Sequence, residues 1–209
     1  PVIGYGTQNI NTLRLWQCEA QEELDFDAFN RQDYQRALDA KNRAEDITRV
    51  LYPNDSTVEG KRLRLKQQYV LSSASLQDMV RIFKSTHGAD LTRFPEFFAV
   101  QLNDTHPAMS IPELIRLLMK EGMDFEQSFA IAQKTFSYTN HTVMGEALEK
   151  WPLELMRSVV PEIADIICRI DHKMRTEIPM DFQERRKKKL FIVDEDIVHM
   201  ANLSIYVGS

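Results

Sequence analysis

The sequence has 209 residues, 43% of them hydrophobic and 27% charged, a composition typical of a globular protein with a sizeable core. Its formal net charge of −5 offers no excess of basic residues to nucleic acid or an anionic membrane, so we expect neither partner. Two widely separated cysteines, Cys18 and Cys168, suit a reducing compartment. No apolar stretch has the length of a membrane span and no signal-peptide pattern is present, so the expected location is the cytoplasm.

The first part of the chain predicts an irregular start and then two long helices. Residues 1–20 are expected to form a loop and a strand that includes Cys18. A helix is expected over 25–51, where neither Pro nor Gly occurs, and its middle at 39–46 is almost wholly polar. Such a helix is either exposed between two bodies or held by charge pairs, so we expect it to project from the domain. A second helix is expected over 59–85.

The central part has the pattern of a parallel α/β sheet. The apolar run Phe97–Leu102 is typical of a strand buried on both faces, and a polar loop follows it. Ser110-Ile111-Pro112-Glu113 has the pattern of a capping box and predicts the start of a helix. A further helix over 124–134 leads to a second strand over 135–139. This order predicts parallel strands joined by a right-handed helical crossover, a Rossmann-like arrangement of the α/β class.

The last part is predicted to be mainly helical. Helices are expected over 152–160 and 161–177, and the second of these has an apolar face for the core. A polar helix or loop is expected over 181–189, then a short helix over 194–202 and a strand over 203–207. Natural domains seldom stop on a strand with nothing to pair with it, so we expect the sequence to be a piece of a longer protein.

Two polar loops follow the two central strands, where parallel sheets bind ligands. The first contains Asp104 and His106, and the second contains His141 and Thr142. Together these side chains supply donors and acceptors for a polyhydroxylated ligand, although a turn with a helix cap would explain the first loop equally well. Asp104, His106 and His141 could also form a metal site, but their spacing matches no metal-binding motif, so no metal is predicted.

Several segments closely resemble the α-glucan (glycogen or maltodextrin) phosphorylases, and the resemblance is collinear over the whole chain. The most specific segments are QLNDTHP (101–107) and YTNHTVMGEALEKWP (138–152), supported by RVLYPNDSTVEGKRLRLKQQY (49–69) and LQDMVRIFKS (76–85). The resemblance implies a glycosyltransferase (hexosyltransferase) of glycogen degradation that uses inorganic phosphate to release glucose-1-phosphate from terminal α-1,4-linked glucose. It also implies a GT-B fold with two Rossmann-like domains, of which residues 1–209 form part of the first.

The resemblance implies pyridoxal phosphate as the cofactor, bound to a lysine of the second domain that this chain does not contain. No catalytic residue is therefore expected within the chain, and the chain alone is expected to be inactive. Residues 25–85 would supply the long helices with dimer and gating elements of a homodimer. Residues 96–209 would form the Rossmann-like part of the sheet.

The resemblance also assigns roles to individual residues. His141 would hydrogen-bond the 6-hydroxyl of the glucosyl unit being transferred. The polar pocket beside that sugar and the gate at its entrance would use the following residues: Asp104, His106, Thr142 and Glu149 in the pocket, Asn54 and Asp55 in the mobile gating loop, and Arg64 behind this loop. Arg81 matches the first of two arginines that bind the AMP phosphate in AMP-activated members.

The chain departs from the animal members at three places. Ser56-Thr57-Val58 replaces Asn-Phe-Phe in the gating loop, which argues against aromatic stacking on inhibitors. Ile82 replaces the second AMP-binding arginine, which implies weak or absent activation by AMP. Cys168, Asp171 and His172 replace Tyr, Asn and Gln, which argues against a separate glycogen anchor site.

Two other functions compete with this interpretation. Residues 25–85 could act as a non-catalytic dimerisation and regulatory module, with the polar loops merely structural. A metal-dependent hydrolase using Asp104, His106 and His141 is the more remote alternative. Within the phosphorylase interpretation, the sequence does not distinguish glycogen, starch and short maltodextrins as the preferred glucan.

Overall fold

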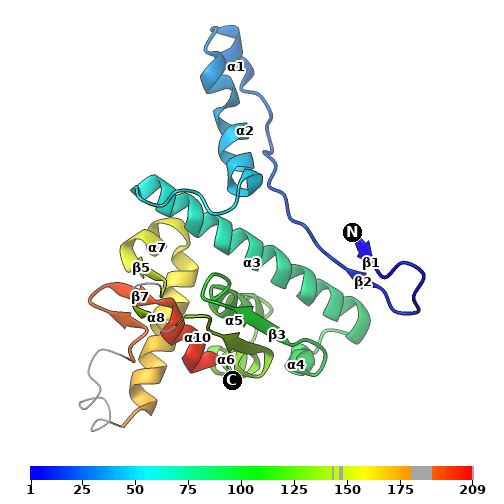
Figure 1. The fold of residues 1–209 in the computed structure, drawn as a ribbon, viewed down its shortest axis with the longest axis vertical. Helices are drawn as coiled ribbons and strands as arrows, with labels where there is room; N and C mark the ends of the chain where they lie inside the picture. The colour runs from blue at the N-terminus through cyan, green and yellow to red at the C-terminus, as the bar shows by residue number, and fades with distance from the viewer. Residues whose placement is uncertain (143, 146–147, 180–189, 209) are drawn as a thin grey trace. The chain divides into compact units, whose positions relative to one another are not determined.

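The computed structural model describes residues 1–142, 144–145, 148–179 and 190–208, so the segment 181–189 lies outside it. The chain forms two compact units, residues 1–67 and 68–209. Helices and short strands occur together, including one parallel pair, which confirms the α/β class (Figure 1). Within the described ranges, no helix has the length and apolar character needed to cross a bilayer.

The first unit opens with an antiparallel hairpin of β1 (Val2–Ile3) and β2 (Asn11–Thr12). The prediction of a strand that includes Cys18 is wrong, because Cys18 belongs to none of the described strands. Its backbone N–H donates instead to Oγ1 of Thr48 at 2.9 Å. Leu13 and Leu15, whose apolar side chains suggested a strand, are exposed.

The helix predicted over 25–51 is divided into α1 (Phe26–Asn30) and α2 (Tyr34–Arg49). The break falls at Gln32, whose φ of 62° is the left-handed conformation that often terminates a helix. Asp25 and Asp33 cap the two helices, accepting hydrogen bonds from backbone N–H groups three residues ahead. Neither Gly nor Pro marks the break, so its signal in the sequence is the capping residue Asp33.

Charge pairs stabilise the polar helix α2, and such pairs are one of the two explanations offered for its polar middle. Arg49 contacts Glu45 at 2.9 Å and Asp46 at 2.8 Å, and Lys41 lies 3.8 Å from Glu45. Exposed pairs at this spacing contribute only about 0.3–0.5 kcal/mol each to helix stability. The buried residues that join α1 to α2 are small, namely Ala28 and Ala37.

The second predicted helix is confirmed as α3 (Val58–His87), whose C-terminal part belongs to the second unit. It is followed by the 3-10 helix η1 (Leu91–Arg93) and the short helix α4 (Phe94–Phe97). The strand predicted over 97–102 is partly wrong, because β3 covers Val100–Asn103 and Phe97 ends α4. Pro at the start of α4 favours a helix there. Gln101 and Asn103 are exposed, so β3 is not buried on both faces.

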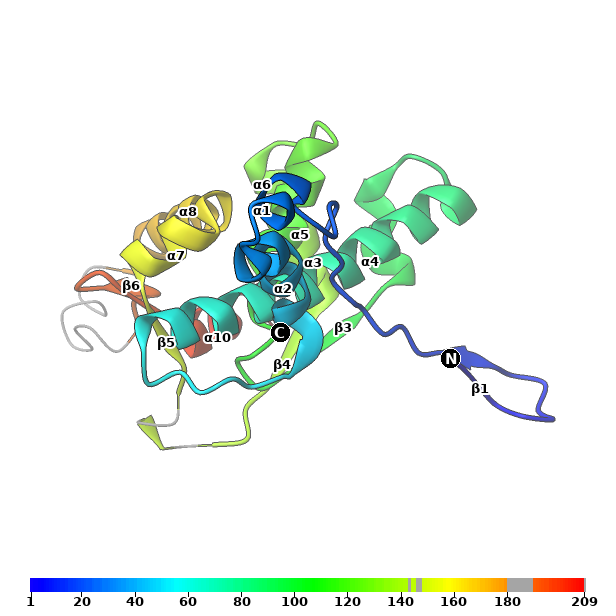
Figure 2. The same ribbon diagram turned by 90° about the horizontal axis from the view of Figure 1, so that it is seen from above.

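The predicted order of strand, helices and strand and the parallel direction of the two strands are confirmed. β3 is followed by α5 (Ser110–Lys120), α6 (Phe125–Thr135) and β4 (Phe136–Thr139). The two strands pair in parallel (Figure 2). In their register Val100 lies opposite Phe136 and Asn103 lies opposite Thr139. Their carboxyl ends therefore lie side by side, which brings the two polar loops to one edge of the sheet.

The prediction of a capping box at Ser110 is wrong, although the helix expected after it is present as α5. Ser110 lies within α5, and the N-cap, Met109, makes no side-chain capping bond. Glu113 lies in the buried part of α5. Its carboxylate forms an ion pair with Arg116.

The C-terminal part of the chain forms the second sheet of the second unit, an antiparallel sheet with strand order β5-β7-β6. The strand β5 (Lys150–Pro152) leads into the predicted helices α7 (Leu153–Val159) and α8 (Pro161–Glu177), which run side by side (Figure 2). The expected apolar face of α8 is buried, as its residues Ile163, Ile166, Ile167, Ile170 and Met174 show.

The helix predicted over 194–202 and the strand predicted over 203–207 are both wrong. The observed elements are β6 (Val193–Asp194), β7 (Ile197–His199) and α10 (Met200–Val207). Glu195 and Asp196 connect β6 to β7 with φ values of 49° and 59°, a hairpin turn that usually contains Asn-Gly. The missing turn signal hid the hairpin, and a short apolar run such as 203–207 fits a buried helix as well as a strand.

A fully buried carboxylate joins α3 to α5. The Glu113 side chain is 0% exposed and accepts hydrogen bonds from Arg116 at 2.7 and 2.9 Å and from Ser73 of α3 at 2.6 Å. The paired charge raises the pKa of Arg116, so the guanidinium stays charged throughout the accessible pH range. Because the carboxylate is buried, its hydrogen-bond donors must all be present for it to be tolerated.

We expect Glu113→Ala to lower the free energy of unfolding by about 3 kcal/mol, because it leaves the buried donors of Ser73 and Arg116 without their acceptor. Urea denaturation followed by circular dichroism would measure the change. Glu162→Gln is the matched control, since Glu162 contacts the same Arg116 at 3.3 Å but is solvent-exposed, and it should change stability by less than about 1 kcal/mol. Equal effects of the two variants would contradict the prediction.

Candidate functional site

The two predicted polar loops meet at the carboxyl ends of β3 and β4. Asn103 lies opposite Thr139 in the register of the pair, and the backbone N–H of Asp104 donates to the carbonyl of Thr139 at 2.9 Å. The parallel ladder thus extends one residue into the first loop. Figures 1 and 2 show the two strands ending next to each other.

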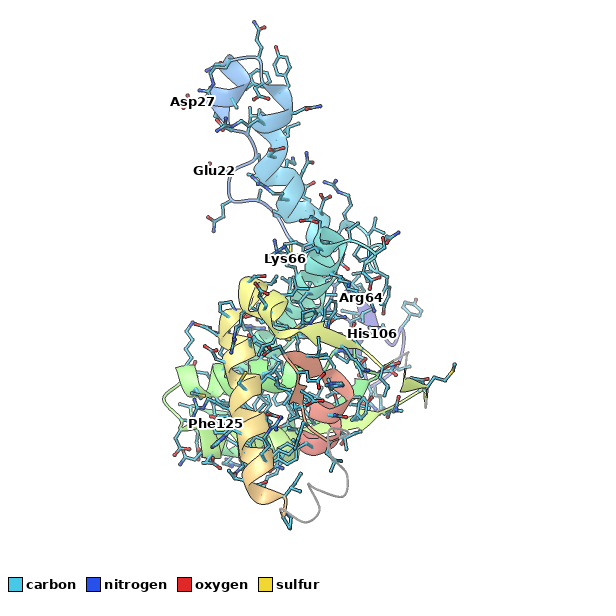
Figure 3. The ribbon with its side chains drawn as sticks, turned by 90° about the vertical axis from the view of Figure 1, so that its left-hand side faces the viewer. Glu22, Asp27, Arg64, Lys66, His106 and Phe125 are labelled. Carbon is cyan, nitrogen blue, oxygen red and sulfur yellow. The ribbon has the colours of Figure 1, made fainter. Side chains whose placement is uncertain are left out.

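The first loop has a constrained backbone at Asp104. Its φ of 67° is a left-handed conformation that Asp and Asn adopt more readily than most residues. The Asp104 carboxylate accepts the N–H of Thr105 at 2.6 Å, and the carbonyl of Thr105 accepts the N–H of Ala108 at 3.0 Å. Thr105 is buried and His106 is half-buried, in the segment between β3 and α5 (Figure 3). These bonds fix the loop before α5 begins.

The second loop brings His141 back to the end of β3. Nε2 of His141 forms a hydrogen bond with Oδ1 of Asn103. The backbone of the loop is ordered by two side chains: Oδ1 of Asn140 accepts the N–H of Thr142 at 3.0 Å, and Oγ1 of Thr142 accepts the N–H of Met144 at 3.1 Å. His141 is exposed, so its ring is available to a ligand. The structure therefore brings His141 and Thr142 to the strand end that carries Asp104.

Tyr138 adds a hydroxyl group beneath this strand end. Its Oη is buried and accepts or donates no hydrogen bond among the described residues. Burial, together with the nearby Asp104 carboxylate, raises the pKa of the phenol, so it remains protonated at neutral pH. The sequence indicated Tyr138 only as a strand residue.

Glu149 is held in place by the second sheet. It precedes β5, its carbonyl accepts the N–H of Met200 at 3.2 Å, and its Oε1 accepts a hydrogen bond from Nε2 of Gln68 at 2.8 Å. The neighbouring Trp151 is buried opposite Val198 of β7. Glu149 is thus a half-buried carboxylate anchored to α3 through Gln68.

The predicted gating residues form their own cluster in the first unit. Arg64 Nη1 donates to Oδ2 of Asp55 at 3.2 Å, and Oδ1 of Asn54 accepts the N–H of Ser56 at 2.9 Å. A Cβ atom added to Gly60 would lie 2.0 Å from the carbonyl oxygen of Asn54, so only glycine allows the loop to pass this close to α3. Asp55 and Arg64 are therefore linked by an ion pair, and Asn54 packs against Gly60.

Arg81, for which the resemblance implied at most a weak allosteric role, forms an ion pair within its own helix. Its guanidinium donates twice to Oδ1 of Asp78, at 2.6 and 3.1 Å, and its side chain is exposed. It borders a groove of about 520 Å³ that also includes Lys84 and Lys120. An anion binding there would compete with Asp78 for Arg81.

The three α8 residues for which the resemblance implied a departure, Cys168, Asp171 and His172, have different environments. Asp171 is buried and accepts the backbone N–H groups of Ile192 and Val193 at 2.9 and 3.1 Å, as well as Nε of Arg175 at 2.7 Å. It therefore fixes the strand segment that leads into β6 and is not a surface-binding residue.

Cys168 and His172 instead line a groove of about 460 Å³ between α6 and α8. Burial raises the pKa of the Cys168 thiol, so the thiolate is disfavoured. The guanidinium of Arg169 lies 4.2 Å from the ring centroid of Phe125 at the start of α6, a residue seen beside α8 in Figure 3.

No group of three or more His, Cys, Asp or Glu side chains in the described part of the chain is arranged to hold a metal ion. Asp104, His106 and His141 therefore do not form such a group. The strand-end loops contain carboxylate, amide, imidazole and hydroxyl groups, and neither Lys nor Arg occurs in 103–109 or 140–142. This composition suits a neutral polyhydroxylated molecule and disfavours a phosphate group.

Comparison with known proteins identifies the family of this chain. The family model for carbohydrate phosphorylases matches residues 1–209, so the chain belongs to this family. It is 45% identical to glycogen phosphorylase 2 of Dictyostelium discoideum, 43% identical to the human liver form of glycogen phosphorylase and 44% identical to glycogen phosphorylase of Saccharomyces cerevisiae. Each match covers 100% of this chain but 22%, 26% and 24% of the relative, so the chain spans about a quarter of their length.

The sheet that holds Glu149 gives a prediction about pH. Burial and the neighbouring Lys150 lower the pKa of His199 in β7 below its ordinary value of about 6.5. The unfolded chain therefore takes up this proton first as the pH falls, so stability is full above the ordinary value and decreases below it. We expect the urea midpoint to fall less between pH 7.5 and pH 5.5 in His199→Gln than in the unmodified chain. Equal losses would contradict the assignment.

Proposed function

We propose that this chain is an internal part of a glycogen (α-glucan) phosphorylase and supplies the sugar-binding side of its active site. The complete enzyme would use inorganic phosphate to cleave terminal α-1,4-linked glucose and release glucose-1-phosphate. The observation that supports this most strongly is the meeting of His141 and Asp104 at one strand end, in a chain that matches the carbohydrate phosphorylase family over its full length.

In this proposal His141 hydrogen-bonds the 6-hydroxyl of the transferred glucosyl unit. The pocket around the sugar would be completed by Asp104, His106, Thr142 and Glu149. Asn54 and Asp55, with Arg64, would form the gate at its entrance, and the close packing of their loop on Gly60 supports a defined loop conformation. Hydrogen bonds to several hydroxyls would orient the anomeric carbon for attack, which is the main contribution such a site makes to the rate.

The phosphate chemistry is assigned to another part of the enzyme. Family membership implies pyridoxal phosphate, whose phosphate group would exchange a proton with the substrate phosphate. The strand-end loops do not fit that cofactor, because they contain a carboxylate and no Lys or Arg that could hold an anion. We therefore assign the cofactor and phosphate sites to the second Rossmann-like domain of a GT-B fold, and only the sugar contacts to this chain.

The first unit is proposed to provide contacts in a cytoplasmic homodimer. Its helices α1 and α2 expose large apolar side chains that a monomer would leave in water, namely Phe26, Phe29, Tyr34 and Leu38. Deleting residues 25–51 should therefore convert the complete enzyme from dimer to monomer, as sedimentation would measure. An unchanged dimer would refute this assignment.

His141→Ala in the complete enzyme tests the sugar-binding proposal. We expect kcat/KM for phosphorolysis of a short maltodextrin to fall at least about tenfold, because a hydrogen bond that positions the sugar is lost. His172→Ala is the matched control, since His172 is an exposed histidine on α8, and it should retain normal kinetics. Full activity of the His141 variant would refute the proposed role. Loss of activity on adding EDTA would favour the metal-dependent alternative.

A further inference from the structure

The hydrogen bond between Asn103 and His141 constrains both the position of the imidazole ring and the nitrogen that carries its proton. Asn103 is the last residue of β3, so its backbone is fixed by the parallel ladder with Thr139. Its Oδ1 is bonded to Nε2 of His141, which arrives from the loop after β4. A side chain on a rigid strand therefore holds a side chain on a loop.

This contact determines which ring nitrogen carries the proton. An amide oxygen can only accept a hydrogen bond, so Nε2 of His141 must be the donor. In a neutral imidazole with a proton on Nε2, Nδ1 has a free lone pair and can only accept. The carboxylate of the adjacent Asp104 is engaged by the N–H of Thr105 at 2.6 Å.

We propose that Asn103 is a positioning residue that holds His141 in the Nε2–H form, so that Nδ1 accepts a hydrogen bond from the ligand. This inference rests on the proposed function, in which that ligand group is the 6-hydroxyl of a glucosyl unit. It adds a selectivity rule: the site requires a group at position 6 that can donate a hydrogen bond. A fluorine at that position can only accept, so it meets the Nδ1 lone pair unfavourably.

The kinetic test uses the complete enzyme in the direction of glucan synthesis, with glucose-1-phosphate and its 6-deoxy-6-fluoro analogue as alternative donors. The unmodified enzyme should prefer the hydroxyl substrate, and Asn103→Ala should reduce this preference about three- to tenfold by releasing the ring. The effect should disappear when His141→Ala is also present, because Asn103 acts through His141. An unchanged preference in Asn103→Ala, or an additive effect in the double variant, would overturn the proposal.

Gln101→Ala is the matched control. Gln101 lies two residues earlier on the same face of β3, and its amide donates to Oγ1 of Thr139. Removing it deletes a similar amide from the same strand edge, so a purely structural role for Asn103 predicts equal effects of the two variants. We expect Gln101→Ala to leave the preference for the hydroxyl substrate unchanged.

Neutron diffraction of the deuterated complete enzyme separates this inference from the proposed function, since it needs no activity. We expect a deuteron on Nε2 of His141 and none on Nδ1, and a loss of this ordered form in Asn103→Ala. A deuteron on Nδ1, or an Asn103 amide that donates to Nε2, would overturn the inference even if the enzyme is a phosphorylase. The expected map in a protein without phosphorylase activity would retain the positioning role and refute only the proposed function.

Discussion

The parallel pairing of β3 with β4 is the constraint on which the candidate site depends. Parallel strands must be joined by a long crossover, and here α5 and α6 supply it. The same pairing makes both strands end at one edge, so two loops separated by more than thirty residues become neighbours. A slip of the register by one residue would place Asn103 on the opposite face from its present contacts. The positions of the side chains in the two loops therefore depend on the four paired positions of β3 and β4.

The crossover helix α5 packs in the interior of the second unit. The helix is buried along most of its length, and Glu113 ties it to Ser73 of α3 in place of a further apolar contact. A buried carboxylate costs stability unless its donors are correctly placed, and here Arg116 and Ser73 supply them. The second sheet is secured in a comparable way, because Asp171 binds two backbone amides ahead of β6.

Most of the fold could be predicted from the sequence wherever an element is long and periodic, as α3, α6 and α8 are. Predictions failed for different reasons: Ser110 lies inside α5 and does not cap it, and the hairpin turn at Glu195 and Asp196 lacks the usual Asn-Gly signal. Resemblance to a family indicated His141 and Asp104, and the strand order explained why they meet. The contact of Asn103 with His141 could not be predicted, because no pattern within a single segment encodes a bond between the end of one strand and the loop after another.

The left-handed backbone at Asp104 limits how this site can evolve. With φ at 67°, only Gly and Asn would replace Asp without appreciable backbone strain, and only Asn would also keep a side-chain oxygen for the N–H of Thr105. Glutamate would retain the charge but would be disfavoured by the same conformation. Across a set of relatives, a narrow range of residues at this position would therefore reflect the geometry of the turn as much as the demands of a ligand. Its invariance alone would be a poor measure of its importance for binding.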